Sequence, residues 1–351
     1  MIQVMIVDDS AVVRSLLAEQ LAHEPDIEIV ATATDPLFAQ QKLRSVCPDV
    51  LILDIEMPRM DGLTFLRQIM AQSPIPTIVF SSLAVAGSHM ALDAMDAGAV
   101  AILCKPSHGV SGYLLEQREQ MVQTVRQAAK ARLQPRAGIS RAAPASPVAP
   151  AAPRTSLART TDRVIAIGTS TGGTQALEYL LTRMPLDCTG MVIVQHMPAN
   201  FTRLFAERLN QACAIEVREA VHGDRVLPGQ ALIAPGGLHL SLTRSGAQYR
   251  VVVQDGPPVS RHKPSVDVLF RSVARAAGAN ALGVIMTGMG DDGARGLLSM
   301  REAGALTLAQ DEHSCVVYGM PKEAVRLGAV QRSLSLEQLP EQLCSFARRS
   351  G

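Results

Sequence analysis

The sequence predicts an α/β protein in which two doubly wound parallel-sheet domains are joined by a flexible linker. Both halves of the chain alternate short β-rich runs with helical patterns, which is typical of parallel sheets covered by helices. The chain has 351 residues, which is too long for one ordinary hydrophobic core. A segment rich in Pro, Ala and Ser separates the halves and lacks the apolar periodicity of an ordered element.

The first domain is predicted to span residues 1–125, the linker residues 126–160 and the second domain residues 161–351. Ser10 is a suitable N-cap for a helix that begins near Ala11, because its hydroxyl can accept a hydrogen bond from a free backbone N–H. The strands expected in the first domain lie at Val4–Val7, Val50–Leu53, Thr77–Phe80 and Val100–Leu103.

In the second domain, most of the expected strands run directly into Gly, Pro or His. The stretch from His239 to Gln254 is instead predicted to be a β-hairpin with Ser245 and Gly246 in its turn region. The other strands expected here lie near Val164–Ile167, Met191–Gln195, Ala231–Ala234, Ala281–Thr287 and Leu306–Ala309.

Composition excludes several classes of protein. The net charge is +1, so binding of nucleic-acid phosphates by charge is not indicated. Aromatic residues make up 3% of the chain and Trp is absent, so stacking on bases is not indicated either. No nucleic-acid partner is therefore expected. The six cysteines form no C-x-x-C pair, which favours a reducing compartment over a disulfide framework or a zinc site. The N-terminus lacks the features of a signal peptide, and no apolar run approaches the length of a membrane helix. We therefore expect a cytoplasmic protein that is not inserted in a membrane.

Polar side chains follow the strands of the first domain. Asp8 and Asp9 come after its first strand, and Asp54 follows its third strand, at Val50–Leu53. Functional groups gather at the carboxyl ends of parallel strands, and a hard divalent cation such as Mg²⁺ would relieve the repulsion among three carboxylates there. Ser81 and Lys105 end two further strands and can face oxygens bound to Asp54. Any one of these residues could simply be an exposed polar strand end, but five at matching ends indicate a site.

This pattern resembles a known family. The motifs VDDS and LDIEMPRMDG and the Lys-Pro pair that begins at Lys105 are similar to those of response-regulator receiver domains, which have a flavodoxin-like fold. The resemblance implies that Asp54 accepts a phosphoryl group from a histidine kinase, with Mg²⁺ held by Asp8, Asp9 and Asp54. It also implies that Ser81 and Lys105 bind the phosphoryl oxygens.

The second domain opens with the stretch VIAIGTSTGGT, an apolar run that ends in a loop of glycines and hydroxyls. A P-loop needs a lysine where Thr174 stands, and a dinucleotide-binding loop needs a glycine where Ser170 stands. The pattern that does fit is G-x-S-x-G from Gly168 to Gly172, a sharp turn that projects Ser170 between a strand and a helix. A glycine-rich turn that only caps the helix is the plainer alternative.

A nucleophilic serine needs a base and a carboxylate that orients the base. His196 directly follows the strand MVIVQ and so lies at the same sheet edge as the serine, while His239 and His262 are rival candidates. Asp291 and Asp292 lie in a glycine-rich loop after another apolar strand, where acids are also common simply because they favour a helix N-terminus. The residue pattern alone does not choose among these histidines and acids.

Five motifs of the second domain resemble the catalytic domain of the chemotaxis protein-glutamate methylesterases, the CheB family. They are VIAIGTSTGGT, VIVQHMPANFT, SRHKPSVDVLF, TGMGDDGARGLL and QDEHSCVVYGMP. The resemblance implies that Ser170 is the nucleophile, His196 the general base and Asp292 the orienting acid. It further implies that the backbone N–H of Met289 contributes to the oxyanion hole and that Thr171 supports the base.

The resemblance to CheB covers about residues 160–348 and implies a Rossmann-like esterase domain. Two small departures are Thr169, where Ala is commoner, and the composition of the linker. The implied activity is phosphorylation-controlled demethylation of glutamate methyl esters, and deamidation of glutamines, on the cytoplasmic helices of chemoreceptors. The ester step needs no cofactor, so Mg²⁺ belongs to the receiver alone.

Two other functions remain to be separated from this one. A non-enzymatic response regulator that binds DNA or a partner would need a helix-turn-helix and a basic patch, and residues 160–351 show neither clearly. A general hydrolase of small esters would share the serine mechanism and differ only in substrate.

Overall fold

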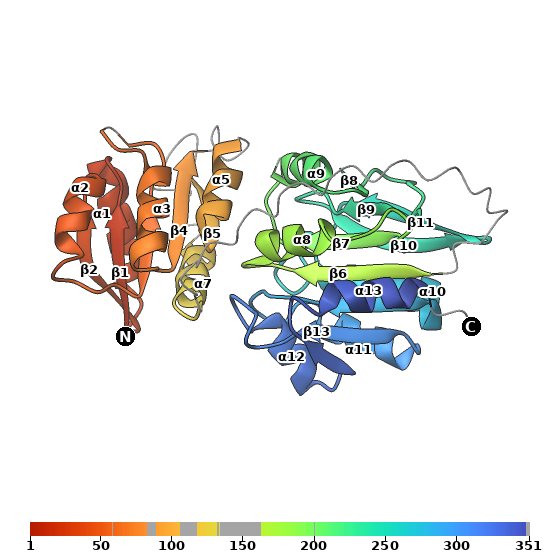
Figure 1. The fold of residues 1–351 in the computed structure, drawn as a ribbon. Coiled ribbons are helices and arrows are strands. Elements are labelled where there is room, and N and C mark those ends of the chain that lie inside the picture. The colour runs from red at the N-terminus through yellow and green to blue at the C-terminus, as the bar shows by residue number, and fades with distance from the viewer. Residues whose placement is uncertain are drawn as a thin grey trace.

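The computed structural model describes residues 1–57, 59–82, 89–105, 118–131, 133, 163–199 and 201–348. Figure 1 shows two α/β domains side by side, each built on a sheet with helices packed against it. The predicted α/β class with two parallel-sheet domains is therefore confirmed. Nearly all of the predicted linker lies outside the described residues.

The first domain has a five-stranded parallel sheet in the order β2-β1-β3-β4-β5. Ser10 caps the first helix as expected, because its side chain accepts a hydrogen bond from the N–H of Val13. The elements are β1 (Ile2–Val7), α1 (Ala11–Ala22), β2 (Ile27–Ala33), α2 (Pro36–Lys42), β3 (Val50–Leu53), α3 (Gly62–Gln72), β4 (Thr77–Ser82), α5 (His89–Ala97), β5 (Ala101–Lys105) and α7 (Arg118–Ala128). The boundary predicted at residue 125 thus falls inside α7.

The second domain has a seven-stranded parallel sheet in the order β14-β13-β12-β6-β7-β9-β8. Its first half comprises β6 (Val164–Thr169), α8 (Gly173–Leu181), β7 (Met191–Gln195), α9 (Phe201–Ala212), β8 (Glu216–Glu219) and β9 (Gln230–Ile233). Its second half comprises α10 (Val266–Ala277), the short 3-10 helix Gly278–Asn280, β12 (Ala281–Ile285), α11 (Ala294–Glu302), β13 (Leu306–Gln310), α12 (Met320–Arg326), β14 (Arg332–Leu334) and α13 (Leu339–Arg348). The predicted hairpin is present as β10 (His239–Ser245) and β11 (Gln248–Gln254), an antiparallel pair in which Ser245 pairs with Gln248.

Three strands have no counterpart among those expected from the sequence, namely β2, β8 and β14. All three are edge strands. Their side chains are largely half-buried or exposed, whereas every residue of β3, β6 and β7 is buried. An edge strand with a mixed polar pattern gives a weaker signal than the continuous apolar run of a central parallel strand.

The sheet order places one crevice at the carboxyl end of each sheet. In the first domain the order in which strands are added to the sheet reverses at β1, which has β2 on one side and β3 on the other. In the second domain the order reverses at β6, which lies between β7 and β12. Open α/β sheets bind ligands at such a switch point, outside the carboxyl ends of the two strands whose connections leave toward opposite faces of the sheet. None of the helices in the described ranges is both long and apolar enough to cross a lipid bilayer.

The two domains touch through α5 and β5 of the first and α8 and α9 of the second (Figure 1). The side-chain amide of Gln175 donates a hydrogen bond to the carbonyl of Met95 at 2.7 Å. Arg208 forms an ion pair with Asp96 across the same contact. Ile102 packs against the apolar core of the second domain. The contact is therefore part apolar and part charged.

Candidate active site

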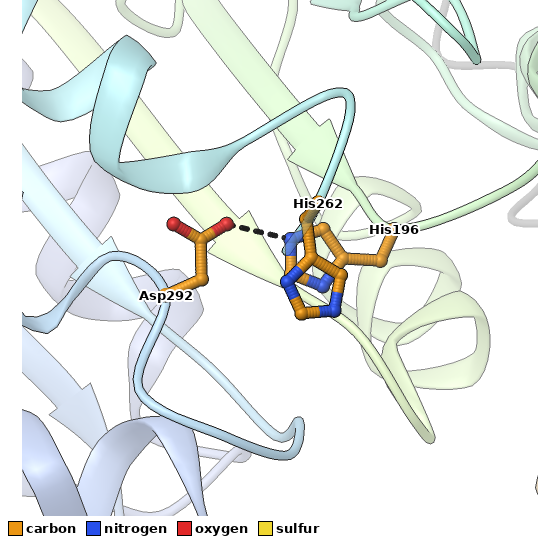
Figure 2. Close-up of side chains that lie close together, drawn as sticks. All are labelled: His196, His262 and Asp292. Carbon is orange, nitrogen blue, oxygen red and sulfur yellow. Dashed lines mark hydrogen bonds and ion pairs between the residues drawn. The ribbon is translucent and has the colours of Figure 1, made fainter. Parts of the chain in front are cut away.

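Three neighbouring strands, β12, β6 and β7, bring the predicted triad residues to one edge of the sheet. Ser170 immediately follows β6, and His196 immediately follows β7. Asp292 lies in the loop between β12 and α11. Figure 2 shows that the histidine and the aspartate reach toward each other from the ends of different strands. The three residues therefore lie at the same edge of the sheet, and their catalytic roles stay a prediction.

His196 and Asp292 form a buried pair. The Nε2 atom of His196 lies 2.8 Å from Oδ2 of Asp292, and the aspartate side chain is 0% exposed. A carboxylate accepts hydrogen bonds, so this contact places the imidazole proton on Nε2 and leaves a lone pair on Nδ1. That Nδ1 atom is buried and has no hydrogen-bond partner within the described part of the chain. Nδ1 is therefore the atom that can accept a proton.

The carboxylate of Asp292 is held by the first turn of α10. Its oxygens accept hydrogen bonds from the hydroxyl of Ser265 at 2.7 Å and from the N–H groups of Val266 at 2.7 Å and Asp267 at 3.0 Å. Burial alone would raise the pKa of Asp292, but the hydrogen bonds from His196, from the N–H of Asp267 and from the hydroxyl of Ser265 outweigh burial and lower the pKa. The group therefore stays ionised and can orient the imidazole.

Asp267 of α10 makes the reciprocal interaction with the start of α11. Its buried carboxylate accepts hydrogen bonds from Gly293 at 3.1 Å and Gly296 at 2.7 Å, at the start of α11. The loop that carries Asp292 thus caps α10, and Asp267 of α10 caps α11, so two helix N-termini exchange acids. This exchange fixes the loop of the candidate triad. The sequence reasoning did not find Asp267; the signal for it is the Ser-Val-Asp start of α10.

The remaining candidate base and acid have other partners. His239 is buried, its Nε2 lies 3.0 Å from the carbonyl of Pro257, and its Nδ1 accepts the N–H of Ser265 at 3.3 Å, so both ring nitrogens are used structurally. Asp291 is 46% exposed and forms a long ion pair with Arg261 at 3.3 Å. The geometry therefore separates the acids at 291 and 292, which the residue pattern alone left open.

Hydrogen bonds to Thr287, which follows β12, hold the loop that carries Ser170. The carbonyl of Thr287 accepts hydrogen bonds from the N–H of Ser170 at 3.0 Å and from the hydroxyl of Thr169 at 2.8 Å. The side chain of Gln195 donates to the carbonyl of Ser170 at 2.9 Å. Gly172 has φ +75°, a left-handed conformation that favours glycine and lets the chain turn into α8. The serine therefore sits on a rigid turn.

Thr171 lies in this turn, and Met289 lies in the facing loop; both are predicted to support catalysis. The backbone N–H of Met289 makes no hydrogen bond within the described residues, so it is available to a ligand. The carbonyl of Thr171 accepts a hydrogen bond from the hydroxyl of Thr287 at 2.9 Å. Among the described residues, no hydrogen bond joins the side chain of Thr171 to His196; the backbone carbonyl of Thr171 helps to fix the turn, and its support of the base stays a prediction.

Gly288 allows the loop of Met289 to lie directly against the serine. A Cβ at this position would lie 2.8 Å from Cβ of Ser170 and 2.4 Å from the sulfur of Met320. We expect Gly288→Ala to push the serine out of place and to lower turnover by about 100-fold, the effect of a misplacement of about 1 Å.

The matched control is Gly256→Ala. Its added Cβ would meet only a ring carbon of His239, at an ordinary 3.4 Å. Turnover and the thermal unfolding midpoint should be measured for both variants. Equal turnover in both would show that the close approach at Gly288 does not position the serine.

A cavity of about 580 Å³ lies next to the loop that carries Met289. Met289, Asp291 and Tyr318 contribute to its wall, and Lys130 from the end of the first domain lines it as well. Its lining carries charges of both signs. The end of the first domain therefore lines a cavity beside the loop of Met289.

The candidate phosphorylation site of the first domain is also assembled. The ammonium of Lys105 bridges Asp8 and Asp54, at 2.7 Å from each. Burial raises the pKa of Asp54 to about 6, although Lys105 opposes the shift. Oxygens of Asp8, Asp9 and Asp54 lie within 4.8 Å of one another, a donor set that fits Mg²⁺. The hydroxyl of Ser81 is buried and has no hydrogen-bond partner among the described residues.

Comparison with known proteins agrees with this geometry. The sequence profile of the CheB methylesterase family matches residues 165–343, and that of the response regulator receiver domain matches residues 4–111. A protein-glutamate methylesterase/protein-glutamine glutaminase of Shewanella oneidensis is 56% identical, covering 99% of this chain and 100% of that protein.

The chain belongs to the CheB methylesterase family.

Other members of the CheB family support the assignment along the whole chain. A protein of the same designation from Dechloromonas aromatica is 57% identical over 99% of this chain and 98% of its own length. The crystal structure of the Thermotoga maritima CheB methylesterase catalytic domain is similar, with 33% identity and a TM-score of 0.51, and covers 52% of this chain and 97% of that one. The CheB profile spans Ser170, His196 and Asp292, the residues that the fold brings to one edge.

Proposed function

We propose that this protein hydrolyses γ-methyl-glutamyl esters on the cytoplasmic helices of chemoreceptors and deamidates glutamines at the same kind of site. The names of its full-length relatives support this activity. The observation that carries the proposal is the buried His196–Asp292 pair beside the turn of Ser170, with Nδ1 of the histidine left without a partner among the described residues. This is the arrangement that activates a serine for acyl transfer.

In the first half of the proposed reaction, Nδ1 of His196 takes the proton of Ser170 as Oγ attacks the ester carbonyl. Asp292 stabilises the imidazolium that forms, because its charge lies 2.8 Å from Nε2 in a buried site. The carbonyl oxygen becomes an oxyanion, and the free N–H of Met289 is the candidate donor for it.

In the second half, the imidazolium returns its proton to the departing methoxide, and methanol leaves. Water then attacks the acyl-enzyme, with Nδ1 of His196 again accepting a proton, and releases the receptor carboxylate and the serine hydroxyl. With a glutamine side chain the leaving group is ammonia. No step of the ester reaction needs a cofactor.

We further propose that the first domain controls this reaction as a phosphorylated receiver. Asp54 would accept the phosphoryl group of a histidine kinase, and Asp8, Asp9 and Asp54 would hold Mg²⁺, which supplies charge neutralisation for the transfer. Lys105 and the hydroxyl of Ser81, which has no partner among the described residues, would bind the phosphoryl oxygens. The cytoplasmic location expected from the sequence is where such a kinase and receptor domain would meet the protein.

Two residues of the candidate phosphorylation site, Ser81 and Lys105, lie on or next to the elements that contact the second domain. Ser81 lies near the end of β4, the strand that precedes α5, and Lys105 ends β5. Both α5 and β5 contact the second domain, through Asp96 and Ile102 among others. A change of partners at Ser81 and Lys105 would therefore act on the elements that hold the domains together, and we propose that phosphorylation loosens this contact.

Arg208→Ala tests this control. The ion pair of Arg208 with Asp96 joins the domains, and both side chains are about one-third exposed (29% and 31%). Such a pair is worth about 1 kcal/mol or less, so its loss should raise the unphosphorylated rate by roughly threefold to fivefold.

Arg203→Ala is the control, because Arg203 lies on the same helix and its one ion pair among the described residues is with the exposed Glu207. Methanol release by both variants should be measured without a phosphodonor. An Arg208→Ala rate equal to that of the wild type and of Arg203→Ala would contradict inhibition through this contact.

The substrate is tested by comparing two esters. Receptor membranes carrying labelled methyl groups and the small ester p-nitrophenyl acetate should be offered to the same enzyme. The proposal predicts a kcat/KM for the receptor at least 100-fold above that for the small ester, because binding to the receptor positions the reacting carbonyl. Comparable values would favour a general small-ester hydrolase.

A further inference from the structure

The ring of His262 is stacked on the ring of His196. The ring centroids are 3.8 Å apart and the planes differ by 5°, so the two imidazoles lie face to face (Figure 2). His262 arrives from the segment before α10, whereas His196 follows β7. One face of the candidate base is thus covered by a side chain that comes from a distant part of the chain.

A tight turn places this second ring. Val259 and His262 bond to each other in both directions, through N–H to carbonyl contacts of 3.1 Å and 3.0 Å. The residues between them, Ser260 and Arg261, have φ of +50° and +67°. Residues with side chains rarely adopt that conformation, and it persists only where the surroundings enforce it. The turn is therefore held in one shape.

The turn is tied to the helix that also holds Asp292. The carbonyl of Ser260 lies 2.7 Å from Nδ1 of His262, so that nitrogen carries the proton of the imidazole. The hydroxyl of Ser260 donates to Asp267 at 3.2 Å. Asp267 is the acid that caps α11, so the turn, the stacked ring and the loop of Asp292 form one bonded unit.

His262 is uncharged near neutral pH. Its pKa is lowered to about 4, first by burial and then by the neighbouring His196 and Arg261, while Asp292 opposes the shift. The face of a neutral ring attracts a cation, whereas a second imidazolium would repel it. A neutral His262 can therefore support His196 both before and after it takes a proton.

Two other roles fit the geometry less well. His196, His262 and Asp292 lie close enough to be considered as metal ligands. The lone pairs of the two imidazoles, however, lie in nearly parallel planes and cannot point at one ion unless a ring rotates. A role as the base is also disfavoured, since it is His196 that is bonded to the buried carboxylate.

We propose that His262 is a positioning residue that keeps the imidazole of His196 in its productive plane and excludes water from one of its faces. The role rests on the proposed serine mechanism. Rotation of His196 about its Cβ–Cγ bond would break the contact of Nε2 with Asp292. The stacked ring leaves no room for that rotation.

The test compares His262→Phe, which keeps a flat ring, with His262→Leu, which does not. We expect His262→Leu to lower kcat by about 30- to 100-fold with KM changed by less than about threefold, and His262→Phe to stay within about fivefold of the wild type. The rate at which a fluorophosphonate labels Ser170 should follow kcat. The control His222→Leu alters an exposed histidine whose one hydrogen bond within the described residues is to the carbonyl of Val253, and it should leave both rates unchanged.

Three results would overturn the inference. A kcat of His262→Leu within about threefold of the wild type would show that the stack positions nothing. A His262→Phe enzyme as slow as His262→Leu, with an unchanged unfolding midpoint, would assign the role to the polar atoms of His262. Should His262→Leu fail to fold, His262→Met replaces it, and a normal kcat in that variant counts equally against the inference.

The labelling rate also separates this inference from the proposed function. If the wild type labels at Ser170 but releases no methanol from receptors, the proposed substrate is wrong. The positioning role would still be decided by the labelling rates of the variants. If Ser170 does not label in the wild type, the serine mechanism and the inference fail together.

Discussion

Ser170→Ala should release almost no methanol from methylated receptors, with kcat lowered by roughly 10⁴- to 10⁶-fold. Without Oγ the acyl-enzyme cannot form, and only binding and oxyanion stabilisation remain. The fold should survive, because the bonds that shape this turn come from the backbone of Ser170 and not from its hydroxyl. Labelled methanol release and the unfolding midpoint should be measured on the same preparation.

Ser299→Ala is a suitable control for this variant. Ser299 lies on α11, and within the described part of the chain its hydroxyl bonds to the carbonyl of Arg295 alone, one turn earlier. Its activity should equal that of the wild type. If Ser170→Ala kept more than about a tenth of the wild-type rate, Ser170 would not be the nucleophile.

Asp292→Asn should lower turnover by roughly 10⁴-fold, as loss of the correct histidine tautomer does in serine proteases. The carboxylate of Asp292 accepts bonds from Ser265, Val266, Asp267 and His196, which are all donors. An amide nitrogen placed there is itself a donor, so at least one of these bonds is lost and the Nε2 proton of His196 is no longer favoured. The unfolding midpoint should fall as well.

Asp291→Asn is the matched comparison, one residue away. Among the described residues, the side chain of Asp291 pairs with the exposed Arg261 alone, so turnover should change by less than about tenfold. Both variants should be assayed well below their unfolding midpoints, so that lost stability is not read as lost catalysis. A larger loss of activity in Asp291→Asn than in Asp292→Asn would move the orienting role to the neighbouring acid.

The general plan of this protein is readable from its sequence because parallel strands end at a common edge. Apolar runs followed by polar residues therefore predict which side chains meet, even when they are far apart in the chain. This reasoning places Ser170 and His196 at adjacent strand ends, as the structure shows. It also groups Asp8, Asp54 and Lys105 in the first domain.

Sequence patterns could not show how the site is held together. Asp267 and Asp292 exchange helix caps, a relation set by how α10 and α11 pack and not by spacing along the chain. The stack of His262 on His196 depends on a strained turn whose residues, Ser260 and Arg261, carry no glycine to signal a left-handed conformation. The residue pattern alone left the acids at 291 and 292 open; the resemblance to the CheB family implied Asp292, and the burial of that side chain in the fold agrees with this choice.

Release of labelled methanol from methylated receptor membranes, with and without acetyl phosphate and Mg²⁺, tests the account most directly. The wild-type protein should release methanol slowly without the phosphodonor and at least several-fold faster with it, while Asp54→Asn should stay at the slow rate under both conditions. No labelled methanol from the wild type under either condition, or one rate for both proteins under both conditions, would contradict a serine esterase controlled by its own receiver.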